Sequence, residues 1–170
     1  MYHRFACPEL QNLGHDLGEL DRQLALLRRR RYQLLPLSEL LERLDRGDPK
    51  LHECVAITVD DGYADFASAA PVFERYDCAA TVFLTSGFVD QQLWLWWDRI
   101  ERALFMLGNG SWSLPVGGTA LPFKLASDED RWAAYWSMVA LFKSIPNADR
   151  LAALDALERF VDAPRPTPPP

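Results

Sequence analysis

The chain has 170 residues, and 49% of them are hydrophobic, which is enough apolar material for one domain with a core. Its net charge of −6 argues against a nucleic-acid partner that is bound by neutralising phosphates. No segment approaches the roughly 20 apolar residues of a membrane span, and the N-terminus has no signal-peptide core. We therefore expect a cytoplasmic protein by default, with no membrane partner.

The first part of the chain predicts helices that alternate with strands. Apolar residues spaced by three and four predict a helix over 17–31, and a short strand follows at 32–35. Ser38 is predicted to cap a helix over 39–44. The continuous apolar segment 55–59 predicts a strand buried on both faces, followed by a helix over 65–76 and a second buried strand over 79–84. This order predicts a βαβ unit with a parallel sheet.

The second part of the chain predicts helices around a hairpin. A helix is expected to run from the tryptophan cluster Trp94, Trp96 and Trp97 to about residue 107, with Asp98 as its N-cap and Arg99 as a surface or paired cation. The tryptophans could stack on sugar rings, but packing at a corner of the fold is favoured. The remaining expected elements are a hairpin over 112–125 that turns at Gly117-Gly118, helices over 128–143 and 149–161, and a proline-rich segment over 163–170.

The most informative residues are Asp60 and Asp61, which end the predicted strand 55–59 and precede Gly62. Ligands of open α/β sheets bind beyond the carboxyl ends of the strands, where these two acids would lie. Adjacent carboxylates repel each other, so at least one of them favours a cation or a proton. A metal site or an acid–base pair is the first hypothesis, and a simple turn at the start of the next helix is the alternative.

The residues around this pair resemble a known family. The sequence Thr58-Val59-Asp60-Asp61-Gly62-Tyr63, followed by the strand at 80–85, resembles the first motif of polysaccharide deacetylases with a NodB-homology domain, carbohydrate esterase family 4. Tyr2-His3-Arg4 is similar to the first strand of many members. The resemblance extends over 1–90 and is weaker over 91–162, which is similar to a helical insertion found in one bacterial subgroup.

The resemblance implies a fold, a reaction and a set of site residues. The fold would be part of an irregular (β/α) barrel of the glycoside hydrolase/deacetylase superfamily, made of residues 1–90 with 91–162 as an insertion. Asp60 would be the catalytic base and Asp61 a ligand of a divalent metal, usually zinc. The enzyme would be a hydrolase of carbon–nitrogen bonds other than peptide bonds. Its substrate would be an acetylated amino-sugar polymer, from which it removes N-acetyl or O-acetyl groups.

The sequence departs from the family pattern at the metal site. The family completes this site with a downstream His-Ser/Thr-x-x-His motif, whereas the three histidines of this chain, His3, His15 and His52, all precede the Asp pair. His15 and His52 are expected to be solvated. His3 is expected to lie at the rim or in the core, together with Tyr63 and Thr85 as pocket-lining residues. Catalytic zinc normally has three protein ligands, so this sequence predicts an incomplete metal site and no other cofactor site.

Three functions follow from these observations. The first is a deacetylase-like chain that is truncated and inactive alone, with 163–170 as a proline-rich tail or a truncated end. The second is a catalytically dead domain that binds carbohydrate or a partner. The third is a Mg²⁺-dependent phosphatase, since Mg²⁺ needs only one or two carboxylates and the substrate phosphate. A partial barrel would leave an open sheet edge, which predicts self-association.

Overall fold

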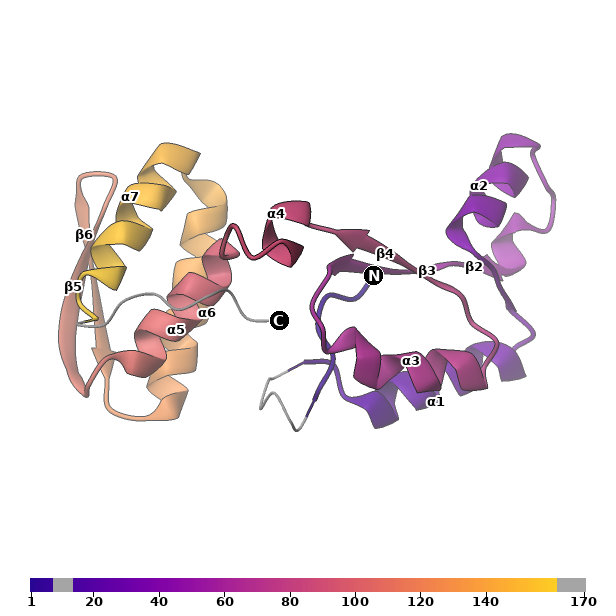
Figure 1. Ribbon diagram of the computed structural model, residues 1–170, viewed down its shortest axis with the longest axis horizontal. Helices are drawn as coiled ribbons and strands as arrows, with labels where there is room; N and C mark the ends of the chain where they lie inside the picture. Colours follow the sequence, from indigo (N-terminus) through magenta and orange to yellow (C-terminus); the bar gives the residue numbers. More distant parts are fainter. Residues whose placement is uncertain (8–13, 162–170) are drawn as a thin grey trace. The chain divides into compact units, whose positions relative to one another are not determined.

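The described residues form two compact units, one within residues 1–93 and one within residues 94–161 (Figure 1). Each unit has its own core of buried hydrophobic side chains. The computed structural model describes residues 1–7 and 14–161, and the fold of this part is mixed α/β. Its named strands form three two-stranded sheets, and no barrel is shown by the described residues. The segment 163–170, which we expected to be a tail, lies outside the described residues.

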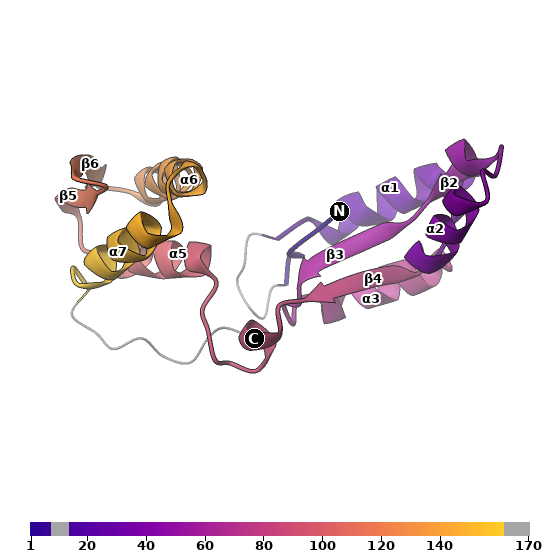
Figure 2. The ribbon, with the colours of Figure 1, turned by 90° about the horizontal axis from the view of Figure 1, so that it is seen from above.

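The first unit is built on a parallel pair of strands, β3 (Ile57–Asp61) and β4 (Ala80–Leu84). The helix between them is α3 (Phe66–Arg75), so the predicted βαβ unit is confirmed. Helices α1 (Leu17–Arg29) and α3 lie side by side against one face of this pair (Figures 1 and 2). Their buried side chains form the core with those of β3, and its members include Leu20, Leu24, Ile57, Val59, Ala69, Val72 and Phe73.

A second, shorter parallel pair precedes the first along the chain. Strand β1 (Gln33–Leu34) pairs with β2 (Cys54–Val55), and Ala56 separates β2 from β3. The single strand predicted over 55–59 is therefore broken at Ala56, where the chain changes pairing partner, and it continues through Asp61. The Asp pair thus belongs to the last two residues of β3 instead of following it.

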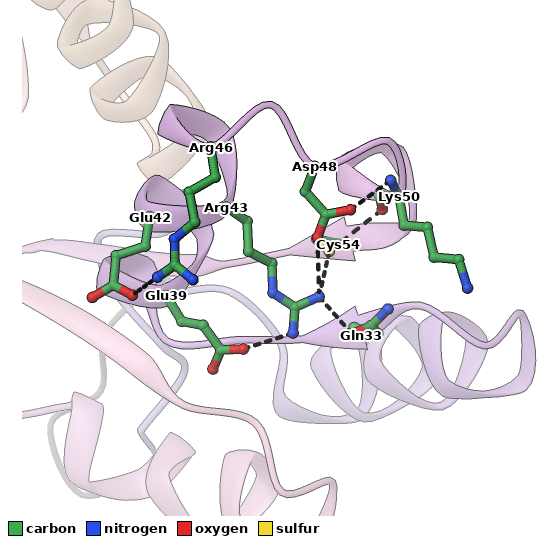
Figure 3. A network of polar contacts seen from close by, with 8 residues as sticks. All are labelled: Gln33, Glu39, Glu42, Arg43, Arg46, Asp48, Lys50 and Cys54. Atoms are coloured by element: carbon green, nitrogen blue, oxygen red, sulfur yellow. Dashed lines mark hydrogen bonds and ion pairs between the residues drawn. The ribbon is translucent and has the colours of Figure 1, made fainter.

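The helix α2 (Leu37–Asp45) has no buried side chain, and polar contacts link it to this shorter pair (Figure 3). Arg43 donates hydrogen bonds to Gln33 Oε1 at 2.9 Å and to Glu39 Oε1 at 2.7 Å, so one guanidinium joins α2 to β1. The predicted cap at Ser38 is wrong, because Pro36 is the N-cap and Ser38 lies in the first turn. The 3-10 helix η2 (Leu51–Glu53) then leads into β2.

Strand β4 differs from its prediction in burial. Phe83 and Leu84, at its end, are 52% and 63% exposed, although both faces of this strand were expected to be covered. Consecutive strand residues point to opposite faces, so the described residues cover neither face at this end of β4. A short helix, α4 (Ser86–Val89), follows β4 and was not predicted, because four residues are too few to show helical periodicity.

The second unit consists of three helices and a hairpin. The predicted turn at Gly117-Gly118 is confirmed, since both glycines have positive φ, at 55° and 82°, as a two-residue hairpin turn requires. Trp96 and Trp97 pack against the core of this unit, which confirms the packing interpretation for them. The elements are α5 (Trp96–Met106), β5 (Gly110–Val116), β6 (Thr119–Leu125), α6 (Asp128–Ser144) and α7 (Asn147–Glu158).

A buried ion pair joins α5 to α7. Arg99 is buried and lies 2.6 Å from Asp155 and 2.7 Å from Glu158, so the predicted paired cation is confirmed. Burial lowers the pKa of Arg99, but the hydrogen bonds to the two carboxylates outweigh burial and leave the pKa raised. Asp98 is not the N-cap that we predicted, because Leu95 holds that position and Asp98 is buried inside the first turn.

Candidate functional site

The Asp pair lies at the carboxyl end of β3, the position where parallel sheets hold ligands. Asp61 pairs with Leu84 across the sheet, and its carbonyl accepts a hydrogen bond from the Thr85 amide at 3.2 Å. On the other side of β3, the Asp60 amide donates to the Tyr2 carbonyl at 2.9 Å. Three segments that are distant in sequence therefore end beside one another, and we call this place the rim.

The backbone reverses direction at the rim through two consecutive residues with positive φ. Asp61 has φ 75° and Gly62 has φ 88°, and the Gly62 amide donates back to the Asp60 carbonyl at 3.0 Å. A Cβ at Gly62 would lie 2.7 Å from Leu84 Cδ2, so a side chain there would be both strained and crowded. A left-handed conformation is uncommon for Asp, which means that the fold holds Asp61 against its own preference.

Asp61 is also electrostatically unusual. Its Oδ2 atom is buried and has no hydrogen-bond partner. Burial raises the pKa of Asp61 above its ordinary value of 3.8, His3 opposes this effect, and the charge of Asp60 adds to it. A carboxylate with a bare buried oxygen favours a proton or a cation, as the sequence led us to expect.

His3 and Asp60 face each other across the rim. His3 Nε2 lies 4.0 Å from Asp60 Oδ2, and their side chains are 49% and 28% exposed. This distance allows attraction when the imidazole is protonated but is too long for a hydrogen bond. Asp60 is thus reachable by solvent, whereas one oxygen of Asp61 is not.

The other two expected lining residues lie at different depths. Thr85 is partly buried and is the N-cap residue of α4. Tyr63 is only 3% exposed, and its ring packs edge-on against Phe88 at 5.0 Å. The guanidinium of Arg4 lies 4.4 Å from the centre of the Tyr63 ring, on which it makes a cation–π contact.

Two residues beside the rim, Arg4 and Asp65, were missed by sequence reasoning. The side chain of Asp65 is fully buried and accepts hydrogen bonds from Arg4 Nε at 3.1 Å and from the Phe5 amide at 3.2 Å. An acid before a helix usually is an exposed cap, so its position in the sequence gave no signal of burial. Asp65 is about sixty residues away from Arg4 and Phe5 in the sequence, and only the fold brings it to them.

His15 and His52 have different environments. His52 is exposed, as expected. The prediction that His15 is solvated is wrong, because its Nε2 atom is buried without a partner and its ring lies 5.0 Å from that of Tyr2. The cause is that the backbone of His15 is hydrogen-bonded to the N-terminal segment, at the Arg4 carbonyl and the Ala6 amide.

The divalent metal implied by the resemblance fits this rim only in part. The bare buried oxygen of Asp61 is suited to a cation. Within residues 1–7 and 14–161, however, no three histidine, cysteine, aspartate or glutamate side chains come together as a group that could hold a metal ion. A catalytic zinc site needs about three protein ligands, so the described residues do not form a complete one.

Comparison with known proteins identifies the family of the chain. A model of the family described as polysaccharide deacetylase matches residues 47–131, which is half of the chain. The match includes both aspartates and Thr85, and it continues into the second unit. No curated protein and no solved structure matches the chain. On the strength of the family match, the chain belongs to the polysaccharide deacetylase family.

Proposed function

We propose that the rim is the base-and-ligand part of a deacetylase centre that hydrolyses acetyl groups on a carbohydrate. The observation that carries this proposal is the buried, unpartnered Oδ2 of Asp61 beside the solvent-reachable carboxylate of Asp60. Two neighbouring acids in such different surroundings are suited to different roles. Asp61 would hold a cation, and Asp60 would accept a proton.

The reaction that we propose is hydrolysis of an acetamide on an amino sugar. Water adds to the acetyl carbonyl carbon and gives up a proton to Asp60. The carbon–nitrogen bond then breaks, the amine nitrogen takes a proton, and the products are acetate and a free amine. Hydrolysis of an O-acetyl ester would follow the same course, with an alcohol as the leaving group. We propose a divalent metal, zinc by family resemblance, as the cofactor of the completed centre.

The missing metal ligands must come from outside the described residues, and the chain alone is expected to release little or no acetate. This can be tested in the coding DNA downstream of residue 170, read in all frames. A His-Ser/Thr-x-x-His motif within some tens of codons would support the proposal. Absence of such a motif would leave the centre incomplete and would contradict a truncated enzyme.

The decisive assay is acetate release from an N-acetylglucosamine oligomer by the form of the protein that includes this motif. We expect Asp60→Asn and Asp61→Asn to abolish release, because the first removes the base and the second a charged ligand. Asp77→Asn is the matched control, since Asp77 is exposed and remote in sequence from the pair. Release that survives Asp60→Asn would show that Asp60 is not the base.

A carbohydrate-binding domain without catalysis is the second candidate, and an observation in the second unit favours it. The rings of Phe105 and Trp132 lie 4.9 Å apart and tilted, Trp132 contacts Tyr135, and Tyr135 contacts Trp136, which is 62% exposed. Exposed aromatic rings are suited to sugar faces. In this case Asp61→Ala would leave glycan binding unchanged in calorimetric titration, whereas in an enzyme the same substitution would abolish acetate release.

A further inference from the structure

The N-terminal segment, residues 1–7, forms one side of the rim through an isolated bridge between Tyr2 and Val59. The Tyr2 amide donates to the Thr58 carbonyl, and the Tyr2 carbonyl accepts from the Asp60 amide, both at 2.9 Å. Phe5, three residues later, is fully buried in the core of the unit. His3 lies between these two anchored residues, on the segment that the family match does not include.

Asp65 provides the attachment between His3 and the core. Its Oδ1 accepts from the Phe5 amide and its Oδ2 from the Arg4 guanidinium, so one carboxylate holds two consecutive residues. A fully buried carboxylate is costly unless it is paired with charge and hydrogen bonds. Here the pairing serves both needs, because Arg4 supplies the charge and Phe5 a backbone donor.

Arg4 extends this attachment to the turn that presents Asp61. The guanidinium lies over the ring of Tyr63, and Tyr63 directly follows Gly62. The ring in turn packs on Phe88 of α4. Arg4 therefore connects the N-terminal segment, the start of α3 and the residues after the Asp pair.

We propose that Asp65 is a positioning residue of the rim, which fixes Arg4 and Phe5 so that His3 faces Asp60. This proposal rests on the proposed function, in which Asp60 and Asp61 are the reacting pair. It adds His3 to the rim as a third polar group, held at 4.0 Å from Asp60 by residues on either side of it. Asp65 acts on His3 through its hydrogen bonds with Arg4 and Phe5.

The test uses Mn²⁺ as a paramagnetic probe of the rim in NMR spectra of the full chain. Mn²⁺ held by the Asp60 and Asp61 carboxylates should broaden the Gly62 and Thr85 amide signals and the ring signals of His3. In Asp65→Asn, which is isosteric but lacks the charge that pairs with Arg4, we expect the broadening of His3 to fall several-fold. The broadening at Gly62 and Thr85 should persist, because the β3–β4 pairing is independent of Asp65.

Two controls separate positioning from general loosening of the fold. Asp77→Asn removes an exposed carboxylate from the same unit and should leave the broadening of His3 unchanged. The exposed His52 lies in η2 and should not broaden in any variant, since residues 54–60 alone span roughly 20 Å. If Asp65→Asn unfolds the unit, Arg4→Lys is used in its place. Lysine keeps the positive charge but lacks the Nε donor, so the broadening of His3 is again expected to fall.

The results distinguish failure of the proposal about Asp65 from failure of the proposed function. Absence of broadening at Gly62 and Thr85 in the wild type would mean that the Asp pair is not a cation site. Broadening there without broadening of His3 would overturn only the proposal about His3 and Asp65. Unchanged broadening of His3 in folded Asp65→Asn, or in Arg4→Lys, would also overturn it.

Discussion

Asp61 carries two separate energetic costs in the folded chain. Its positive φ is unfavourable for a residue with a side chain, and its buried Oδ2 has lost water without gaining a hydrogen bond. Stability alone would select glycine or asparagine at this position. The chain keeps a carboxylate, which is what we expect where a cation is bound or a proton is transferred.

Asp61→Asn should stabilise the folded chain at neutral pH by up to about 1 kcal/mol, because it removes a desolvated charge. Burial raises the pKa of Asp61, so the folded chain binds this proton more tightly than the unfolded chain does. The wild type therefore recovers stability as pH falls through the raised pKa towards 3.8, and the advantage of Asn shrinks on acidification. Urea unfolding at a series of pH values measures this difference.

Asp77→Asn is the matched control for this measurement, because Asp77 also has a positive φ, at 44°, but is exposed. The preference of asparagine for this backbone contributes to both variants, so the difference between them isolates burial. An equal gain in both variants, or a gain at position 61 that does not depend on pH, would contradict the role given to the buried carboxylate.

The residues of the rim could be predicted from the sequence only in part. Asp60 and Asp61 were found because a strand and a glycine flank them within a few residues, and local order is visible in a sequence. The contact of Asp65 with Arg4 and Phe5 was not found, because it depends on how the N-terminal segment packs beside α3. The burial of His15 was missed for the same reason.

At the scale of elements, strand β4 ends in exposed apolar side chains. Its only named strand partner among the described residues is β3, and its end carries the exposed side chains of Phe83 and Leu84. An unpaired strand edge with apolar side chains can pair with another chain. Self-association through β4 is therefore the expected behaviour of this chain at high concentration.

Phe83→Lys should reduce this association, because a charged residue on an edge strand disfavours pairing between chains. Sedimentation velocity over a range of concentrations measures the effect as a lower average mass. Leu151→Lys is the control, since Leu151 is an apolar residue of α7 that is 44% exposed and belongs to no strand. A wild-type chain that stays monomeric at every concentration would contradict the prediction.

Element boundaries were predicted less well than the elements themselves. Helix α6 was predicted from the acids in its first turn, and the hairpin from two segments around Gly117-Gly118. The caps at Ser38 and Asp98 were assigned from residue preference, but both side chains lie inside the first turn of their helices. Burial decided the case of Asp98, which is 4% exposed and so is not the solvated cap that its residue type suggested.

At the scale of the whole molecule, the two cores can be observed independently. All six tryptophans lie at or after residue 94, and all three histidines lie at or before residue 52. Tryptophan fluorescence thus reports on the second unit alone, and histidine ring signals in NMR spectra report on the first. We expect the two probes to give different midpoints in urea, because each core can unfold separately.

Arg99→Ala should shift only one of these transitions. It leaves Glu158 without its buried partner, and loss of one member of a buried ion pair costs about 3 kcal/mol. The tryptophan transition should move to lower urea while the histidine transition stays in place. Coincident transitions that move together would show that the chain unfolds as one cooperative unit.

No helix in the described part of the chain is long and apolar enough to cross a bilayer. The mixed α/β fold, the parallel β3–β4 pair and the family were all predictable, because they depend on local patterns and one motif. The division of the core between two units depends on which helix packs on which, and this does not follow from periodicity.

The attachment of Tyr2 to Val59 has a practical consequence for handling the protein. The bridge is parallel, so Met1 lies level with Thr58, and a flexible segment fused before Met1 would be tethered within about 7 Å of Asp60 along the strand. A purification tag of histidines at that end would bring surplus imidazoles next to a bare carboxylate oxygen. Such a tag could supply metal ligands that residues 1–7 and 14–161 do not bring together, and so imitate a natural centre. Metal titrations should therefore use material that is untagged or tagged at the other end.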